Sequence, residues 1–396
     1  MAIGKLLKGV NVPSKDFISS NIDIMRGLAI LLVIAVHTSN MTSLMGLNPN
    51  AVNHPIVFKK ITDILNFGAS GVGLFFFISG FLIYMLYWKN INYKSYAVRR
   101  ASRIMPLWAF WLAFSTVIAT LGIRWWFHYE EHGRTVTNFL YGEGYNLLDA
   151  QNIIPILAYF VFLGFLNPTN YNWVVPGGWS IQTEIYHYTL FPFMRKAGMT
   201  FSLCVLFIIQ ILFILFTFGK QPSPELAILS AYVVGPIFFV LGMLTSQAFK
   251  FIQTKEELFK VKIIDWILMV SILVVSCFIK INPNSSINTP KTITVIVVSI
   301  IASFVIYKLN IIKKLTSSVG KYSYGMYFSH FLIMPLIAYP IVNYLFIEAN
   351  NEKINTSVAI LSLIPIFLIS VLGSYLVALV TYNMLEKHVI NWSKKF

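Results

Sequence analysis

The first apolar run of the chain contains the stretch RGLAILLVIAVH, residues 26–37. It begins with an arginine and ends with a histidine, and every residue between them is apolar or glycine. With its flanks it forms an apolar segment over 22–44, which is long enough to cross the roughly 30 Å hydrocarbon core of a bilayer as a helix. We therefore predict that this segment is a transmembrane helix that carries two ionisable side chains.

The composition of the whole chain also indicates a membrane protein. Of its 396 residues, 57% are hydrophobic and only 11% are charged. Soluble domains carry about 25% charged residues, so a soluble protein is excluded. Only helices or closed barrels satisfy backbone hydrogen bonds in lipid, and runs of this length favour helices. We predict an all-α polytopic membrane protein in a single membrane domain, 1–396, with ten spans: 22–44, 66–88, 104–122, 179–194, 199–218, 226–247, 263–281, 293–309, 322–345 and 357–382.

Basic residues set the predicted orientation of these spans. Lys and Arg crowd the short links 89–103, 248–262 and 308–321, and ten spans place all three links on one side of the membrane. Cytoplasmic loops are enriched in Lys and Arg, so both termini are predicted to be cytoplasmic. The net charge of +15 then reflects these loops and indicates no nucleic-acid partner. The stretch 123–178 becomes an outer loop, within which 153–166 is predicted to be a re-entrant or interfacial segment.

Arg26 and His37 lie eleven residues apart, about three helical turns, so their side chains share one face. Asp23 falls on the same face, three residues before Arg26, and can pair with it. Two structural explanations stay open: Arg26 as an interfacial anchor and His37 as an interhelical hydrogen-bonding residue. Ionisable residues inside spans often line functional cavities, and the shared face favours that explanation.

Two further motifs lie in and before the second and third predicted spans. GVGLFFFISGF (71–81) contains Ser79 and glycines that permit close helix packing. RRASRIMPLW (99–108) places Arg100 and Arg103 on one face where the chain enters its third span. The two arginines fit the ordinary enrichment of cytoplasmic loops in Arg and Lys. They also fit an anion site, because the guanidinium group binds phosphate through two parallel hydrogen bonds.

Two motifs place polar groups in later spans. GGWSIQTEIYHY (177–188) carries Glu184 inside a span, where a paired structural carboxylate and a functional one are the alternatives. His187 is either a partner of Glu184 or an interfacial ring. KYSYGMYFSHF (321–331) places His330 in the ninth span, where a packed, hydrogen-bonded histidine is favoured. Cys204 and Cys277 lie in apolar runs, and neither a disulfide framework nor a metal constellation is indicated.

Taken in order, these pieces resemble the acyltransferase-3 family of bacterial membrane O-acyltransferases, in its stand-alone form. The resemblance covers most of the chain and rests on these pieces: Asp23 with Arg26, ten intervening residues and His37; FFFISGF; Arg100 and Arg103 before IMPLW; WSIQTE with Trp179, Glu184 and then Tyr188; and SYGMYFSH with His330. His187 departs from the family, which often has an aromatic residue there. The resemblance implies ten helices in the bacterial cytoplasmic membrane and acyl transfer from acyl-CoA to a hydroxyl of a glycan.

The chemistry implied by the family suits these residue types. A base must remove the hydroxyl proton, and histidine serves near neutral pH. We assign His37 as base, with Glu184 either orienting His37 or contacting the acceptor. The remaining residues divide into a donor-binding set and a supporting set: Arg26, Arg100, Arg103 and Ser79 for the donor; Asp23, Trp179, Tyr188 and His330 in support.

The predicted substrates are acetyl-CoA, or another acyl-CoA such as succinyl-CoA, and a surface polysaccharide such as O-antigen or exopolysaccharide. No permanently bound cofactor is expected. Aromatic residues of the outer loop could pack on sugar rings, although membrane-interface belts have the same composition: Trp125, Trp126, Tyr129, Tyr141, Tyr145, Tyr171 and Trp173. The competing hypothesis is a polysaccharide exporter without acyl-transfer chemistry, since intramembrane ionisable residues also suit transport. The acceptor sugar, its hydroxyl position and the oligomeric state stay open.

Overall fold

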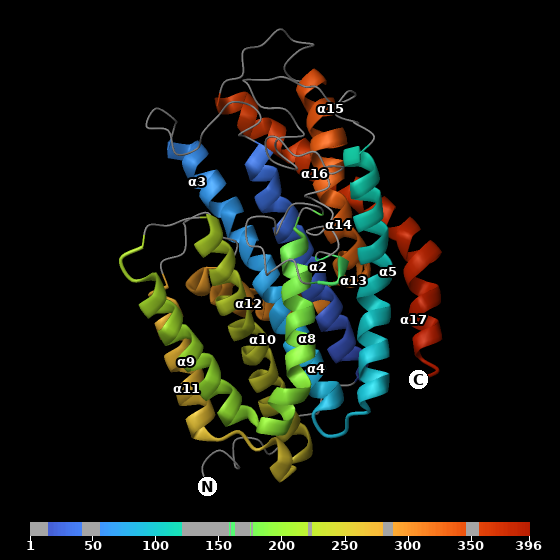
Figure 1. Cartoon of the computed structure of the whole chain (residues 1–396). Helices are drawn as coiled ribbons and strands as arrows, with labels where there is room; N and C mark the ends of the chain where they lie inside the picture. The colour runs from blue at the N-terminus through green and yellow to red at the C-terminus, as the bar shows by residue number, and fades with distance from the viewer. Residues whose placement is uncertain are drawn as a thin grey trace. The chain divides into compact units, whose positions relative to one another are not determined.

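The computed structural model describes residues 15–41, 56–120, 158, 160–162, 175, 177–220, 224–279, 288–345 and 356–396. These residues form helices and no strand, as the composition predicted (Figure 1). The α-helices are α2 (Lys15–Asn40), α3 (Ile56–Leu65), α4 (Ser70–Tyr87), α5 (Tyr93–Thr120), α8 (Gly178–Ala197), α9 (Met199–Thr217), α10 (Pro224–Thr254), α11 (Ile263–Ser276), α12 (Thr289–Tyr307), α13 (Asn310–Lys321), α14 (Ser323–Ile333), α15 (Tyr339–Asn343), α16 (Thr356–Thr381) and α17 (Lys387–Ser393).

Seven helical segments of the described chain are long and apolar enough to cross a membrane. They coincide with the predicted spans 22–44, 66–88, 199–218, 226–247, 293–309, 322–345 and 357–382, and the molecule is a multi-pass membrane protein. The other three predicted spans fall on α5, α8 and α11. Helix α11 has 14 residues, about 21 Å at 1.5 Å per residue, which is shorter than the predicted 263–281 segment. The count of ten spans and the side of the termini remain predictions.

The basic links 89–103, 248–262 and 308–321 are partly or mostly helical rather than loops. Helix α5 already begins at Tyr93, so Arg99, Arg100 and Arg103 lie in its first turns. Helix α10 continues to Thr254, and α13 occupies most of the predicted link 308–321. The loop prediction failed because Lys and Arg are good helix formers. A helix that carries them can also continue into the membrane interface, where their charged ends reach water.

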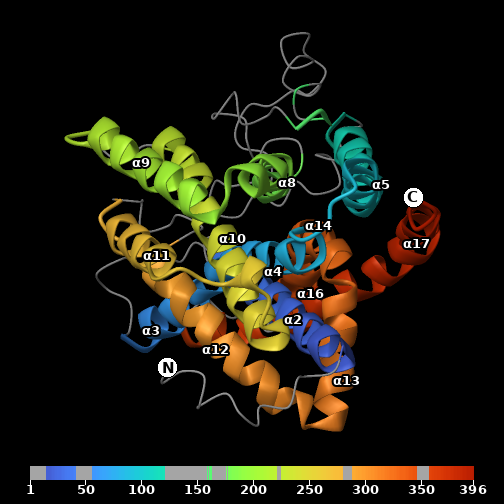
Figure 2. The same ribbon diagram turned by 90° about the horizontal axis from the view of Figure 1, so that it is seen from below.

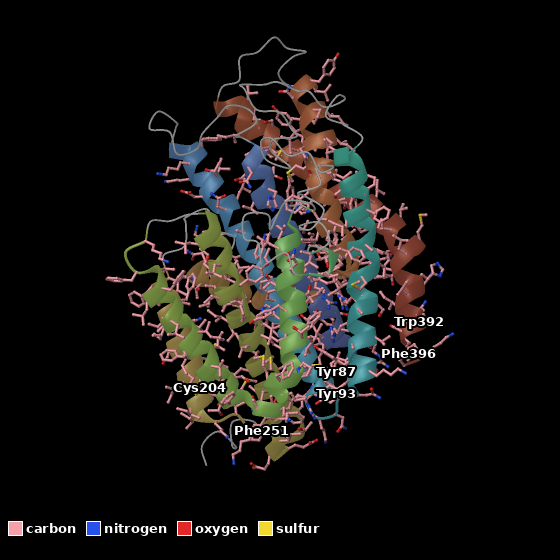
Figure 3. The ribbon with its side chains drawn as sticks, viewed as in Figure 1. Tyr87, Tyr93, Cys204, Phe251, Trp392 and Phe396 are labelled. Atoms are coloured by element: carbon pink, nitrogen blue, oxygen red, sulfur yellow. The ribbon has the colours of Figure 1, made fainter. Side chains whose placement is uncertain are left out.

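The helices place apolar side chains outward and polar ones inward. On α9, a stripe of large apolar residues is exposed at helical spacing, whereas Ser202 and Gln210 are buried. On α16, leucines face outward in the same way while Ser370 and Ser374 are fully buried. This pattern is the reverse of a soluble bundle, and it is expected where lipid surrounds the protein and small or polar residues join helices. Cys204 on α9 is half-buried and Cys277 is exposed, and both are free thiols (Figure 3).

Contacts within the chain define two compact units. In the first, α9 packs against both α10 and α11 (Figures 1 and 2). In the second, α14 packs along α16, and the Ser329 hydroxyl donates to the Ser374 carbonyl over 3.3 Å. The units comprise Met1–Leu28, Val72–Tyr96 and Tyr186–Gly320 for the first, and Ala29–Gly71, Ala97–Ile185 and Lys321–Phe396 for the second.

Glycines in the FFFISGF motif have a packing role in the first unit. A Cβ atom at Gly80 of α4 would overlap the Phe239 carbonyl of α10, and a Cβ at Gly242 of α10 would overlap the Phe77 carbonyl of α4. The two backbones therefore meet at reciprocal glycines, as small residues allow in membrane helix pairs. This confirms the packing explanation of the glycine positions in 71–81.

We expect Gly80→Ala to lower the free energy of unfolding by about 1–3 kcal/mol, the usual range for overpacking. The added methyl group meets backbone, which cannot move aside as a side chain can. The measurement is thermal unfolding in detergent. Gly373→Ala is the control, because its Cβ meets the Ile333 side chain at 2.7 Å and the substitution favours the helix. Equal melting temperatures for Gly80→Ala and wild type would contradict the packing role.

Candidate active site

The first helix of the described chain, α2, carries three predicted site residues in one uninterrupted element. An Arg26 guanidinium nitrogen lies 3.4 Å from an Asp23 carboxylate oxygen, so the predicted pair is confirmed. His37 follows after a rise of about 16 Å. Asp23 and Arg26 belong to the first unit, and His37 belongs to the second.

His37 packs against two rings of α14 in the second unit. Its imidazole centre lies 5.3 Å from that of His330 and 4.5 Å from the centre of the Phe331 ring. The His330 and Phe331 rings are themselves 4.1 Å apart, so the three rings form one cluster. His330 is fully buried, whereas His37 is half-buried. The structure thus joins two histidines that lie 293 positions apart in the chain.

A hydroxyl pair holds the start of α8 against α14. The Ser180 hydroxyl donates to the Tyr327 hydroxyl over 2.7 Å, and the Tyr327 hydroxyl donates to the Gly177 carbonyl over 3.0 Å. Gly177 has a φ of +75°, which favours glycine. A Cβ atom there would overlap the edge of the Phe331 ring and lie 3.1 Å from the Tyr327 hydroxyl. The WSIQTE motif, with Trp179 buried, therefore begins beside the cluster of His37, His330 and Phe331.

We expect Tyr327→Phe to lower the free energy of unfolding by about 1–3 kcal/mol. Each buried hydrogen bond contributes about 0.5–1.5 kcal/mol, and this change removes the bonds to Ser180 and Gly177. Thermal unfolding in detergent measures the effect. The matched control is Tyr93→Phe, because Tyr93 is exposed at the start of α5 (Figure 3). A melting temperature for Tyr327→Phe equal to that of the control would show that the hydroxyl pair does not stabilise the second unit.

The remaining residues of the WSIQTE region divide between the two units. Glu184 lies half-buried on α8 in the second unit. His187 lies in the first unit between two rings, with centres 5.0 Å from Phe76 and 4.8 Å from Phe239. Both ring nitrogens of His187 are buried without a hydrogen-bond partner among the described residues. The alternatives of a partner for Glu184 and of an interfacial ring are therefore both wrong for His187, which is a core ring.

Ser79 and Tyr188 also meet in the first unit. The Tyr188 hydroxyl donates to the Ser79 hydroxyl at 3.5 Å, and the Tyr188 carbonyl accepts a hydrogen bond from Tyr96 at 2.8 Å. Tyr188 is buried, and Ser79 is half-buried on α4. These contacts join the FFFISGF and WSIQTE regions through polar groups.

The two predicted donor-site arginines of α5 lie three residues apart in the second unit. Both Arg100 and Arg103 are half-buried. Arg103 acts electrostatically on Glu386, a buried carboxylate at the end of the π-helical turn Tyr382–Glu386. Sequence reasoning missed Glu386. A carboxylate in an otherwise basic and aromatic C-terminal stretch was the signal that could have identified it.

This arrangement can support proton transfer from a hydroxyl. The His37 imidazole is half-buried and packs against His330 and Phe331. Histidine accepts a proton near neutral pH, and a low-polarity setting strengthens nearby electrostatic contacts. The outer-loop aromatic residues and the segment 153–166 lie outside the described residues, apart from residues 158 and 160–162, so those two predictions stay open.

Comparison with known proteins gives one result. The chain matches a family described as an acyltransferase domain, the acyltransferase-3 family, over residues 19–382. No curated protein and no solved structure matches the chain. The match covers nearly the entire chain and includes every site residue predicted from the sequence, whereas Glu386 lies beyond it. The protein therefore belongs to the acyltransferase-3 family, as the order of its motifs predicted.

Proposed function

We propose that this protein transfers an acetyl group from cytosolic acetyl-CoA to a hydroxyl of a cell-surface polysaccharide, such as O-antigen or exopolysaccharide. We place it in the cytoplasmic membrane of a bacterium with both termini in the cytoplasm. The observation that carries the proposal is the half-buried His37, which packs against His330 and Phe331 beside the start of the WSIQTE helix. Family membership supports the reaction class, membrane O-acyl transfer.

In the proposed reaction, His37 is the base. It takes the proton of the acceptor hydroxyl as the hydroxyl oxygen attacks the thioester carbonyl carbon. The new carbon–oxygen bond forms, the carbon–sulfur bond breaks, and the coenzyme A thiolate leaves with the proton that His37 returns. Glu184 holds either His37 or the acceptor in place. No metal is needed, because a thioester is already an activated acyl group.

The donor contributes phosphates, which require cationic partners. Arg100 and Arg103 lie at the start of α5, and the proposed role of both is to bind these phosphates through paired hydrogen bonds. Arg26, held by Asp23 at 3.4 Å, and Ser79 complete the proposed donor set.

The experiment uses purified protein in nanodiscs, acetyl-CoA with a radiolabelled acetyl group, and polysaccharide extracted from a strain lacking the gene. We expect label to enter the polysaccharide and to be released by mild base, which cleaves esters. Succinyl-CoA, tested in parallel, identifies the acyl group. Absence of transfer from both donors, together with polysaccharide retained inside deletion cells at normal acyl content, would overturn the proposal in favour of an exporter.

A further inference from the structure

In His330, the second histidine of the ring cluster, one contact defines which ring nitrogen carries the hydrogen. His330 Nδ1 lies 3.1 Å from the Met326 carbonyl oxygen one turn earlier on α14. A carbonyl can only accept a hydrogen bond, so Nδ1 carries the hydrogen. In the neutral imidazole the other nitrogen, Nε2, then presents a lone pair. The backbone of α14 therefore fixes which nitrogen of His330 is the acceptor.

That acceptor has no partner among the described residues. His330 is fully buried, and its Nε2 is a buried atom without a hydrogen bond. Buried polar atoms are almost always paired, and an unpaired one lowers stability. Both ring nitrogens of His187 are in the same state, so the unpaired atom alone indicates no function, and the side chain beside His330 decides what its Nε2 can bind.

The side chain placed to bond to the His330 Nε2 is His37. Its ring centre lies 5.3 Å from that of His330, and both imidazole rings pack against the Phe331 ring. A neutral His37 that acts as base presents one nitrogen as acceptor to the hydroxyl and already carries a hydrogen on the other, and after proton transfer both nitrogens are donors. One donor faces the reacting oxygen, and the other needs an acceptor. A base oriented by a third group is the general arrangement for activating a hydroxyl.

We propose that His330 is a positioning residue for His37, and that its Nε2 accepts a hydrogen bond from the protonated His37 ring during acyl transfer. This inference rests on the proposed function. His330 exchanges no proton in this role, and it holds the His37 ring in the orientation that transfer needs. It takes the place that a carboxylate occupies in many hydrolase sites.

The kinetic test compares two substitutions of His330. We expect His330→Leu to lower kcat by about 10–100-fold, by analogy with the loss of groups that orient metal-bound imidazoles, with the KM for acetyl-CoA unchanged. His330→Gln should recover most of kcat, because an amide can donate to Met326 and accept from His37. In a His37→Ala background, His330→Leu should cost nothing further. A full additional loss there, or wild-type kcat in His330→Leu, would overturn the proposal.

A structural role alone would predict a different pattern. His187→Leu is the matched control, because His187 is also a buried imidazole packed against aromatic rings, in the other unit. With rates expressed per folded protein, we expect its kcat to equal that of wild type. If His187→Leu lowers kcat as much as His330→Leu, the loss reflects removal of a buried ring and the positioning role is refuted.

A spectroscopic readout separates this inference from the proposed function. In protein with ¹⁵N-labelled histidine, we expect one imidazole with a protonated Nδ1 and an unprotonated Nε2 that is absent from His330→Gln. The Nε2 signal should shift in His37→Ala. A His330 ring protonated on Nε2, or one indifferent to His37→Ala, overturns the inference. Failure of wild type to use any acyl-CoA overturns the proposed function and leaves this signal interpretable.

Discussion

Replacing His37 by alanine is expected to reduce acyl transfer to the polysaccharide by about 10²–10⁴-fold, the range that a general base contributes. The side chain is half-buried and ends in a ring cluster, and no hydrogen bond or ion pair holds it among the described residues. Its removal should therefore leave the amount of folded protein and the binding of acetyl-CoA close to wild type. The measurement is transfer of labelled acetyl groups in nanodiscs.

The control for this prediction is His388→Ala, because His388 is exposed on the last helix, α17. It should transfer acetyl groups at the wild-type rate. His37→Gln distinguishes loss of the base from loss of packing, since glutamine fills space without accepting a proton at this pH. Full activity of His37→Gln would eliminate His37 as the base and would leave it a packing residue, the alternative that the sequence allowed.

The membrane helices were predictable because their signal is local. A run of apolar residues such as 26–37 needs no information from the rest of the chain, and α2 contains it without interruption. The ends of helices were less predictable. Arg100 and Arg103 lie within α5 rather than in a loop, because composition does not reveal where a basic segment stops being helical.

The site was only partly predictable. The sequence favoured a packed, hydrogen-bonded His330, and its bond to the Met326 carbonyl confirms that prediction. Its place beside His37 depends on how α14 packs against α2, which no local pattern encodes. Glu386 was missed for the same reason: its burial, and the electrostatic effect of Arg103 on it, arise only once the turn Tyr382–Glu386 and α5 are folded.

The Arg100→Ala/Arg103→Ala double variant is expected to weaken acetyl-CoA binding by about 100-fold or more. A hydrogen bond to a charged group contributes about 1.5–3 kcal/mol, and each 1.4 kcal/mol is a factor of ten in affinity. The two losses act on one ligand, so they should combine. Equilibrium binding of labelled acetyl-CoA to protein in nanodiscs measures the change. Binding should also weaken as salt rises, because phosphate contacts are screened.

Arg99→Ala is the matched control, because Arg99 lies on the same turn of α5 with its side chain exposed. It removes one positive charge from the same region without touching the half-buried pair. If Arg99→Ala weakens binding as much per charge as the double variant, the arginines act only as a diffuse cationic surface. If the double variant binds acetyl-CoA normally but inserts in a mixed orientation, the arginines serve topology alone. Selective loss of binding in the double variant is the outcome that a phosphate site requires, because a diffuse surface would not distinguish the buried pair from its exposed neighbour.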